Sequence, residues 1–340
     1  MTANSFGQFF RITSFGESHG VGLGVVVEGC PAGLDFDESL LRRELERRRP
    51  GKKQTESARA EGDVVEILSG VYQNKTLGTP IAMIVRNVDT RSEDYQEIAA
   101  GAHRPGHADD MWKLKYAHVD PRGGGRSSGR ETVARVMGGA VAQMLVRRLA
   151  PECRIVAFAS QIGPFALNEA DREDLSVEKI EASPARFPSN IHSKDVEALL
   201  LDAKVEGRSY GGVAEIHIVQ APVGLGQPVF HKIKADLAAA MMSVGATAGV
   251  DFGAGFDAVT AEGSHFHRQG EAPYGGVRGG LTTGEKISLR VAFKPTSSVL
   301  DVAKKGRHDP CIVPRAIPVL ESMAWLVIAD HLLWSRIDKL

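Results

Sequence analysis

Apolar and polar residues alternate over several short segments of the chain, and this period of two predicts β-strands. A polar turn around Gln73, Asn74 and Lys75 is expected to join the strands near 64–71 and 80–86. The expected strands lie near residues 7–13, 21–28, 64–71, 80–86, 154–161, 212–220 and 285–293.

Other segments repeat apolar residues every three or four positions, which predicts helices. In residues 37–49, Leu40, Leu41 and Leu45 share one face, and the Pro-Gly pair at 50–51 ends the segment. Residues 162–192 have the weakest pattern, so we expect a long surface loop there. Further helices are expected near residues 131–149, 193–206, 229–243 and 316–334.

The order of these elements predicts the fold class. Strands and helices are mixed without the regular βαβ alternation of a parallel sheet, which favours an α+β fold in which sheets and helices form layers. No linker divides the chain, so one domain over residues 1–340 is expected. Each half has strands followed by a long helix, which suggests an internal structural duplication, although the halves share no sequence identity.

Composition narrows the class of protein. The 41 basic residues are balanced by 42 acidic ones, so no overall charge favours binding to nucleic acid or to a membrane. The three cysteines form no CxxC pair, which argues against a zinc site and against a disulfide framework. No N-terminal signal is apparent, and no apolar run approaches the roughly 20 residues of a membrane span. We therefore expect a cytoplasmic protein.

Residues suited to chemistry are concentrated in a few glycine-rich segments, most of them at the ends of predicted elements. Loops on a rigid scaffold commonly carry binding groups, and glycine lets backbone N–H groups approach a ligand closely. The segments are GESHG at 16–20, RRRPG at 47–51, RPGHAD at 104–109, RGGGRSS at 122–128, KPTSS at 294–298 and RHDP at 307–310.

The segment GGGRSSGRE at 123–131 predicts a helix N-terminus. Ser128 and Glu131 have the spacing of a capping box, and an apolar stripe of helical period follows them. The free N–H groups of such a helix, together with Arg126, could hold a phosphate. The alternative is an ordinary capped helix behind a glycine turn, and the charge of Glu131 at the positive end of the helix favours that alternative.

Two histidines are candidate catalytic residues, and two arginines are candidate substrate-binding residues. His19 and His107 lie in glycine-containing turns, where an imidazole can transfer protons near neutral pH, although a lone loop histidine is more often a surface residue. Arg48 and Arg49 lie in the last turn of the helix before Pro50, where a guanidinium can bind a carboxylate or phosphate with two hydrogen bonds. The neighbouring arginines 42 and 43 fit a solvated helix face instead.

Several familiar catalytic signatures are absent. The chain has no GxxxxGK[ST] loop, no HExxH, and no GxGxxG between a strand and a helix. GRSSG at 125–129 matches the G-x-S-x-G nucleophile elbow of hydrolases, but the glycines before it cannot form the strand that an elbow requires. A hydrolase built on Ser127 and a non-catalytic protein that binds a flavin or a phosphate are kept as alternative functions.

Taken together and in this order, the segments resemble the chorismate synthase family over almost the whole chain. Residues 275–284, GGVRGGLTTG, also look like a family block. Three blocks are especially specific to this family: GESHGVGLGVVVEGCP at 16–31, GRSSGRETVARVMGGA at 125–140 and RHDPCIVPRAIPVLESM at 307–323.

The resemblance implies a carbon–oxygen lyase that catalyses the last step of the shikimate pathway. It would eliminate phosphate from 5-enolpyruvylshikimate 3-phosphate to give chorismate, with reduced FMN (FMNH2) as cofactor and no net oxidation. An electron-rich flavin could lend an electron to the substrate ring and recover it as the C6 hydrogen leaves. The family also implies a β-α-β sandwich and a homotetramer whose subunits contribute loops to each other's sites.

Site residues follow from the same resemblance, position by position. His19, His107 and Asp309 are the implied catalytic residues, with His19 acting toward the leaving phosphate and His107 toward the flavin. Ser18, Arg48, Arg49 and Arg130 are the implied substrate-binding residues. The implied cofactor-binding residues are Arg126, Ser127, Ser128, Gly245, Ala246, Gly279, Lys294, Pro295, Thr296, Ser297, Ser298 and Arg307.

Two segments depart from the family pattern. Relatives often have an arginine shortly after RRRPG that is associated with nicotinamide-nucleotide or phosphate binding, whereas this chain has Gln54 after two lysines. NADPH is therefore expected only as an indirect reductant, acting through a flavin reductase or another reductant. The stretch 299–304 is also shorter than in many relatives, so the cover over the flavin is expected to differ.

Overall fold

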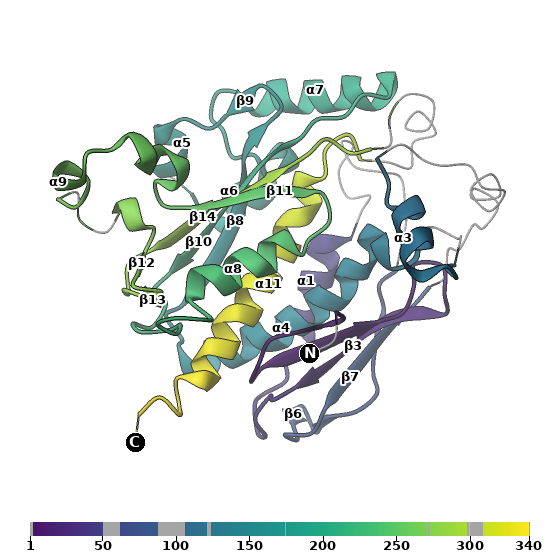
Figure 1. Ribbon diagram of the computed structural model, residues 1–340. Coiled ribbons are helices and arrows are strands. Elements are labelled where there is room, and N and C mark those ends of the chain that lie inside the picture. Colours follow the sequence, from purple (N-terminus) through teal and green to yellow (C-terminus); the bar gives the residue numbers. More distant parts are fainter. Residues whose placement is uncertain are drawn as a thin grey trace.

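A computed structural model describes residues 3–49, 62–87, 106–120, 124–173, 175–268, 270, 272–297, 299 and 309–339. Two five-stranded antiparallel sheets lie on either side of a layer of long helices (Figure 1). This arrangement is the layered α+β sandwich that the sequence predicts. The strands and helices lie largely where the hydrophobic pattern places them.

The first sheet is built from the N-terminal part of the chain. Its strand order is β1-β2-β3-β7-β4, and every neighbouring pair is antiparallel. Alternate residues of β3 and β7, including Val25 and Met83, are fully buried against the helices. The strand bounds are β1 Ser5–Phe6, β2 Arg11–Phe15, β3 Gly22–Glu28, β4 Val65–Ile67 and β7 Ile81–Arg86.

The second sheet comes from the C-terminal half. Its order is β11-β14-β10-β8-β9, again with antiparallel neighbours. Five consecutive residues of the central strand β10 are buried, and α11 packs against it from the helix layer. The strand bounds are β8 Arg154–Ile162, β9 Phe165–Ala166, β10 Gly212–Val219, β11 Thr247–Phe252 and β14 Ile287–Phe293.

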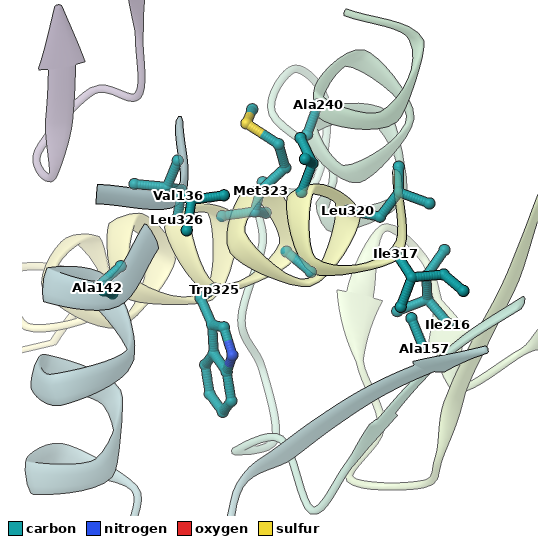
Figure 2. Packing of buried hydrophobic residues seen from close by; sticks show 14 of the residues in the cluster. Val136, Ala142, Ala157, Ile216, Ala240, Ile317, Leu320, Met323, Trp325 and Leu326 are labelled. Atoms are coloured by element: carbon teal, nitrogen blue, oxygen red, sulfur yellow. The ribbon is translucent and has the colours of Figure 1, made fainter. Parts of the chain in front are cut away.

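Four helices fill the space between the sheets: α1 (Glu38–Arg48), α4 (Thr132–Leu149), α8 (Ile233–Met242) and α11 (Val313–Trp334). Helix α11 lies in the centre of the layer, and Figure 2 shows its side chains packing against those of α4, α8, β8 and β10. It is long and apolar enough to pass as a membrane span, contrary to the expectation that no such run exists, but 94% of its apolar window is buried. Helix α11 is therefore a core helix.

The two sheets share one connectivity. Strands β2, β3, β4 and β7 lie in the spatial order β4-β7-β3-β2, and strands β8, β10, β11 and β14 lie in the equivalent order β11-β14-β10-β8. In each half a helix, α1 or α8, connects the second of these strands to the third, and a long helix, α4 or α11, follows the fourth. This correspondence fits the structural duplication that the sequence suggests.

Residues 162–192 contradict the prediction of a long surface loop. They contain β9, two short helices α5 (Glu169–Glu173) and α6 (Val177–Ala182), and a 3-10 turn at Pro184–Arg186. Leu167, Ile180 and Phe187 are buried there, but such short elements leave too few repeats for a period to be visible. The predictions also omitted β11 and α3 (Asp109–Tyr116).

The remaining elements lie outside the central layers. Helix α7 (Ser193–Glu206) ends at Gly207, whose φ of 71° gives the left-handed backbone typical of a helix C-terminus. In the hairpin of β5 (Val71–Tyr72) and β6 (Lys75–Thr76), Gln73 and Asn74 both have positive φ, as a type I′ turn requires. The last elements are α9 (Gly263–Phe266) and the hairpin of β12 (Val277–Arg278) with β13 (Leu281–Thr282).

Two contacts fix how the layers assemble. Helices α4 and α11 cross closely at Gly139, where an added Cβ would lie 2.4 Å from the Cβ of Ser322. Near the other end of α11, the carboxylate of Asp330 accepts hydrogen bonds from the backbone N–H groups of Gln8, Phe9 and Phe10. The N-terminal segment is thereby attached to the C-terminal helix.

Candidate active site

Three helix ends meet around one buried arginine. Arg48 lies in the last turn of α1, its side chain is 1% exposed, and its Nη1 is 3.4 Å from the hydroxyl of Thr132, the first residue of α4. Arg315, in the first turn of α11, lies close enough for its charge to act on Arg48. The positive ends of α4 and α11 and the guanidinium groups therefore favour negative charge in this region.

Asp63 bridges two of the arginines. Its Oδ2 lies 2.5 Å from Nη2 of Arg48 and its Oδ1 lies 2.5 Å from Nη1 of Arg130. The Asp63 side chain is 3% exposed, so all three charged groups are shielded from water. One carboxylate between two guanidiniums leaves the trio with a net positive charge, which can attract a further anion.

The pKa directions follow from this arrangement. Burial alone would raise the pKa of the Asp63 carboxyl, but the charges of Arg48 and Arg130 outweigh it and hold that pKa below its ordinary value. Burial lowers the pKa of the Arg48 guanidinium, Asp63 opposes the shift, and the like charges of Arg315 and Arg130 add to it. Because an arginine stays protonated at any physiological pH, the region keeps its positive charge.

The turn that carries Ser18 and His19 lies beside Arg130. The Ser18 hydroxyl is 3.1 Å from Nδ1 of His19, and Ser18 itself is 7% exposed. Asn87, immediately after β7, donates to the carbonyls on either side of this pair and accepts a hydrogen bond from Nε of Arg130. The turn and the arginines are thereby held next to each other.

Asp309 lies just before α11, and its Oδ2 is 2.5 Å from Nη1 of Arg315. Its backbone carbonyl accepts a hydrogen bond of 3.1 Å from the hydroxyl of Thr296, whose own carbonyl accepts one from Ser209. The segment after β14 is therefore attached to the start of α11. Asp309 is 8% exposed, and its carboxylate is oriented by Arg315.

The segment that carries His107 contacts the residues after β14. The carbonyl of Gly106 accepts a hydrogen bond of 2.8 Å from the hydroxyl of Ser297 and one of 3.4 Å from Nζ of Lys294. The backbone N–H of Lys294 in turn donates to the carbonyl of Ala246. Residues from three distant parts of the sequence, near 106, 246 and 294–297, thus lie together.

The start of α4 differs in detail from the predicted capping box. The hydroxyl of Ser128 accepts a hydrogen bond from the N–H of Arg130 in a 3-10 turn at Gly129–Glu131, and α4 begins only at Thr132. The Glu131 carboxylate pairs with Arg135 at 2.9 Å instead of returning to the turn. The i,i+4 ion pair therefore replaces the reciprocal hydrogen bond of the box.

Arg126 and Ser127 make local hydrogen bonds. Nη2 of Arg126 donates to the Ser14 hydroxyl at 2.6 Å and Nη1 donates to the Gly16 carbonyl, which places Arg126 beside the His19 turn. The Ser127 hydroxyl donates to the Gly124 carbonyl within a 3-10 turn. A nucleophile elbow requires a strand directly before its serine. The turn at Gly124 and Gly125 is incompatible with that geometry.

One predicted cofactor residue lies apart. Gly279 is in the β12–β13 hairpin, which adjoins the beginning of β14, whereas Lys294 follows the end of that strand. The seven extended residues of β14 place the two ends of this strand about 20 Å apart. Some sequence predictions lie outside the described residues. These are the predictions for Gln54, Ser298 and Arg307, and the prediction for the stretch 299–304 except Val299.

Several residues of this region were not predicted from the sequence. Asp63 and Asn87 are isolated polar residues near strand ends and carry no motif. Arg315 lies six residues after Asp309, within the family block at 307–323. That block was the sequence feature from which Arg315 could have been predicted. Arg49 was predicted, and its Nε is buried without a hydrogen-bond partner among the residues that the structure describes.

The backbone around the site has room for a flat, phosphate-bearing cofactor such as FMN. An ideal Cβ at Gly125, Gly129 or Gly245 would meet no atom within 4 Å, so a ligand can approach these glycines closely. Lys294 supplies a cation, and Thr296 and Ser297 supply hydroxyls, on the neighbouring segment. The donor set therefore fits a phosphate and an anionic ring.

The fold brings buried arginines and an imidazole-bearing turn together in one positively charged region, an arrangement typical of enzymes that act on anionic substrates. A family model for chorismate synthase matches residues 10–333. The chain belongs to the chorismate synthase family, a family of lyases in aromatic amino-acid biosynthesis.

Individual relatives agree with this assignment. Chorismate synthase from Bdellovibrio bacteriovorus HD100 is 58% identical over 343 residues, covering 100% of both chains. Chorismate synthase from Porphyromonas gingivalis W83 is 43% identical, covering 98% of this chain and 96% of the relative. A crystal structure of chorismate synthase superposes with a TM-score of 0.73 at 32% identity, covering 97% of this chain and 93% of the other.

Proposed function

We propose that this site binds 5-enolpyruvylshikimate 3-phosphate and, with reduced FMN, eliminates its phosphate to give chorismate. The main supporting observation is the pair Arg48 and Arg130, bridged by Asp63 beside the turn of Ser18 and His19. In this elimination the C3–O bond to phosphate breaks, the C6–H bond breaks, and a new double bond completes the diene.

The charges of the substrate suit the arginines. The substrate carries one phosphate and two carboxylates, and a guanidinium can bind either group with two hydrogen bonds. Arg48 and Arg130 would bind anionic groups from one side, with Arg49 beside them at the end of α1. The hydroxyl of Ser18, which contacts His19, would bind the same end of the substrate.

Proton transfer is assigned to three residues. His19, next to Arg130 through Asn87, would donate a proton toward the departing phosphate. His107, in the segment that contacts Ser297, would act toward the flavin side. Asp309, oriented by Arg315, would accept or position the proton that leaves C6.

The flavin is assigned to the opposite wall of the site. Its phosphate and ring edge would be held by Arg126, Ser127, Ser128, Gly245, Ala246 and residues 294–298, with Arg307 and with Gly279 from a neighbouring subunit. Reduced FMN would supply electron density to the substrate ring without net oxidation. The chain's own segments would exclude water around the stacked pair.

The decisive test is chorismate formation from the substrate under anaerobic conditions with reduced FMN. His19→Ala and His107→Ala should each lower turnover by about 10²–10⁴-fold, the usual contribution of general acid catalysis, and should change FMN affinity less than severalfold. Near-normal turnover in both variants would remove the proton-transfer roles.

Two other functions predict different results. A non-catalytic flavin-binding protein would bind FMN and substrate without turnover. A hydrolase built on Ser127 would be labelled at that serine by a phosphonate probe, but the Ser127 hydroxyl donates to its own turn and no histidine among the described residues forms a hydrogen bond with it.

The proposal also covers the domain organisation, the oligomeric state, the cellular location and the reductant. We assign residues 1–340 to one domain, and the protein to a cytoplasmic homotetramer that has no nucleic-acid or membrane partner. The separation of Gly279 from Lys294 supports a site shared between subunits. A flavin reductase or another reductant would deliver electrons, with NADPH acting indirectly. Sedimentation that gives only monomer at micromolar concentration would contradict the tetramer.

A further inference from the structure

Asn87 connects the His19 turn to the arginines with three side-chain hydrogen bonds. Its Nδ2 donates to the carbonyl of Glu17 at 3.1 Å and to that of Gly20 at 2.9 Å. Its Oδ1 accepts a hydrogen bond of 3.3 Å from Nε of Arg130. Both amide hydrogens and the amide oxygen are therefore used.

The surroundings of Asn87 fix the orientation of its carboxamide. Two carbonyl oxygens lie on one side and can only accept, while a guanidinium lies on the other side and can only donate. A flipped amide would place its oxygen against both carbonyls and its N–H groups against Arg130. Only a side chain with two donors and one acceptor at this length satisfies all three partners.

Asn87 is itself held by the first sheet. Its backbone N–H donates to the carbonyl of Val21 at 3.1 Å, directly after the pairing of Gly22 in β3 with Arg86 in β7. The turn also has its own hydrogen bond, from the N–H of Gly20 to the carbonyl of Glu17. Asn87 therefore transmits a position set by the sheet to both the turn and Arg130.

We propose that Asn87 is a positioning residue that sets the place of the His19 imidazole relative to Arg130. This inference rests on the proposed function of His19 in proton transfer. A proton donor must lie within hydrogen-bond reach of the leaving group, and a shift of about 1 Å in such a group can reduce the rate about 10²-fold. In the proposed function Arg130 binds an anionic group of the substrate. Asn87 contacts both Arg130 and the His19 turn, so it would place the proton donor next to that group.

Two substitutions of Asn87 distinguish the effect of side-chain size from the effect of its hydrogen bonds. Asn87→Ala removes all three side-chain bonds, and Asn87→Asp keeps the size but replaces both donors with acceptors that repel the carbonyls of Glu17 and Gly20. Each should lower kcat about 10- to 100-fold, as for a misplaced catalytic group. Asn168→Ala is the matched control, since Asn168 accepts a hydrogen bond from the N–H of Asp171 in a turn that has no part in the site.

A double-mutant cycle on kcat is the main test. If Asn87 acts through His19, Asn87→Ala should change kcat less than about 3-fold in the His19→Ala background, because effects on a shared group are not additive. Equal effects in the two backgrounds would overturn the proposal. It would also be overturned if Asn87→Ala slowed turnover while His19→Ala did not, or if Asn87→Ala had normal kcat.

A second measurement does not depend on activity. Amide hydrogen exchange at residues 17–20 should become faster in Asn87→Ala, because the turn loses two of its anchors, and should be unchanged in Asn168→Ala. Unchanged exchange in both variants would overturn the positioning role. If the wild-type protein forms no chorismate but exchange still increases, the proposed reaction fails and the placement of the turn by Asn87 stands.

Discussion

Arg315 holds the carboxylate of Asp309 at 2.5 Å, across the first turn of the helix that forms the core of the molecule. Asp309 is hydrogen-bonded to Thr296 in the segment after β14. The charge of Arg315 also helps to lower the pKa of Arg48, so the pair links that segment to the region around Arg48. Arg315 therefore serves both the acidic group assigned to proton transfer and the electrostatics of the arginines.

We expect Arg315→Gln to lower kcat by about 10- to 100-fold, because a hydrogen bond between charged groups contributes roughly 1.5–3 kcal/mol. Steady-state kinetics with FMN in excess provide the measurement. The exposed pair of Arg208 with Glu206 gives a control, and Arg208→Gln should have normal kcat. Normal kcat in Arg315→Gln would show that Asp309 does not need this partner.

Asp63→Ala should destabilise the protein by about 3–5 kcal/mol, since it leaves two buried guanidiniums without their shared counter-charge. Urea unfolding followed by fluorescence measures the change. Asp35→Ala removes an exposed ion pair with Lys75 and should leave the stability close to that of the wild type. Equal effects of the two substitutions would contradict the burial argument.

The same carboxylate predicts a dependence of stability on pH. The pKa of Asp63 is lower in the folded protein than in the unfolded chain, so its contribution is present above the unfolded value of about 3.9. It is lost as the pH falls through the lower folded value. Unfolding free energies of the wild type and of Asp63→Asn should therefore converge on acidification below about pH 4. A constant difference between them would exclude this linkage.

Arg48→Lys keeps the charge but loses the planar fork that contacts Asp63 and, in the proposed function, would bind a substrate anion. We expect weaker substrate binding and unchanged FMN binding, both measurable by calorimetry with each ligand separately. Arg42→Lys, on the exposed face of the same helix, is the matched control and should leave both affinities unchanged. If Arg48→Lys also has the wild-type affinity for substrate, Arg48 does not contact it.

Gly139→Ala should destabilise the protein by about 1–3 kcal/mol through overpacking, because the new methyl group meets Ser322 at 2.4 Å. The midpoint of thermal unfolding provides the measurement. Gly263→Ala, in helix α9, places its methyl group in open space and should be neutral or slightly stabilising. A Gly139→Ala protein as stable as the wild type would mean that the two helices can separate without loss.

The sequence predicts most of the long elements because their periods are long enough to read. Helix α7 has the bounds predicted for it, α1 is one residue shorter than predicted at each end, and α4 begins one residue later than predicted. Helix α11 begins three residues before the predicted start, because Pro314 occupies the first turn, where proline is tolerated. The short elements in residues 162–192 could not be predicted in this way.

The residues of the candidate site could be predicted from the sequence only in part, for a different reason. Glycine, arginine and histidine in loops mark the segments, but the partners of the arginines are fixed by tertiary structure. Asp63 lies 15 residues from Arg48 and 67 from Arg130. No local pattern specifies that one carboxylate serves both, and a lone Asp or Asn carries no motif. These residues became apparent only from the distances between side chains.

The central position of α11 has a consequence for biosynthesis. Both sheets bury apolar side chains against a layer whose central helix comprises residues 313–334, and this helix follows the strands of both sheets along the chain, so it is synthesised after them. Asp330 also closes the chain onto residues 8–10. While the chain grows, the second sheet must therefore expose an apolar face until α11 is made, whereas the first sheet packs mainly against α4. The core of the second half therefore cannot be completed before α11 is synthesised, and an apolar face exposed in the growing chain favours aggregation.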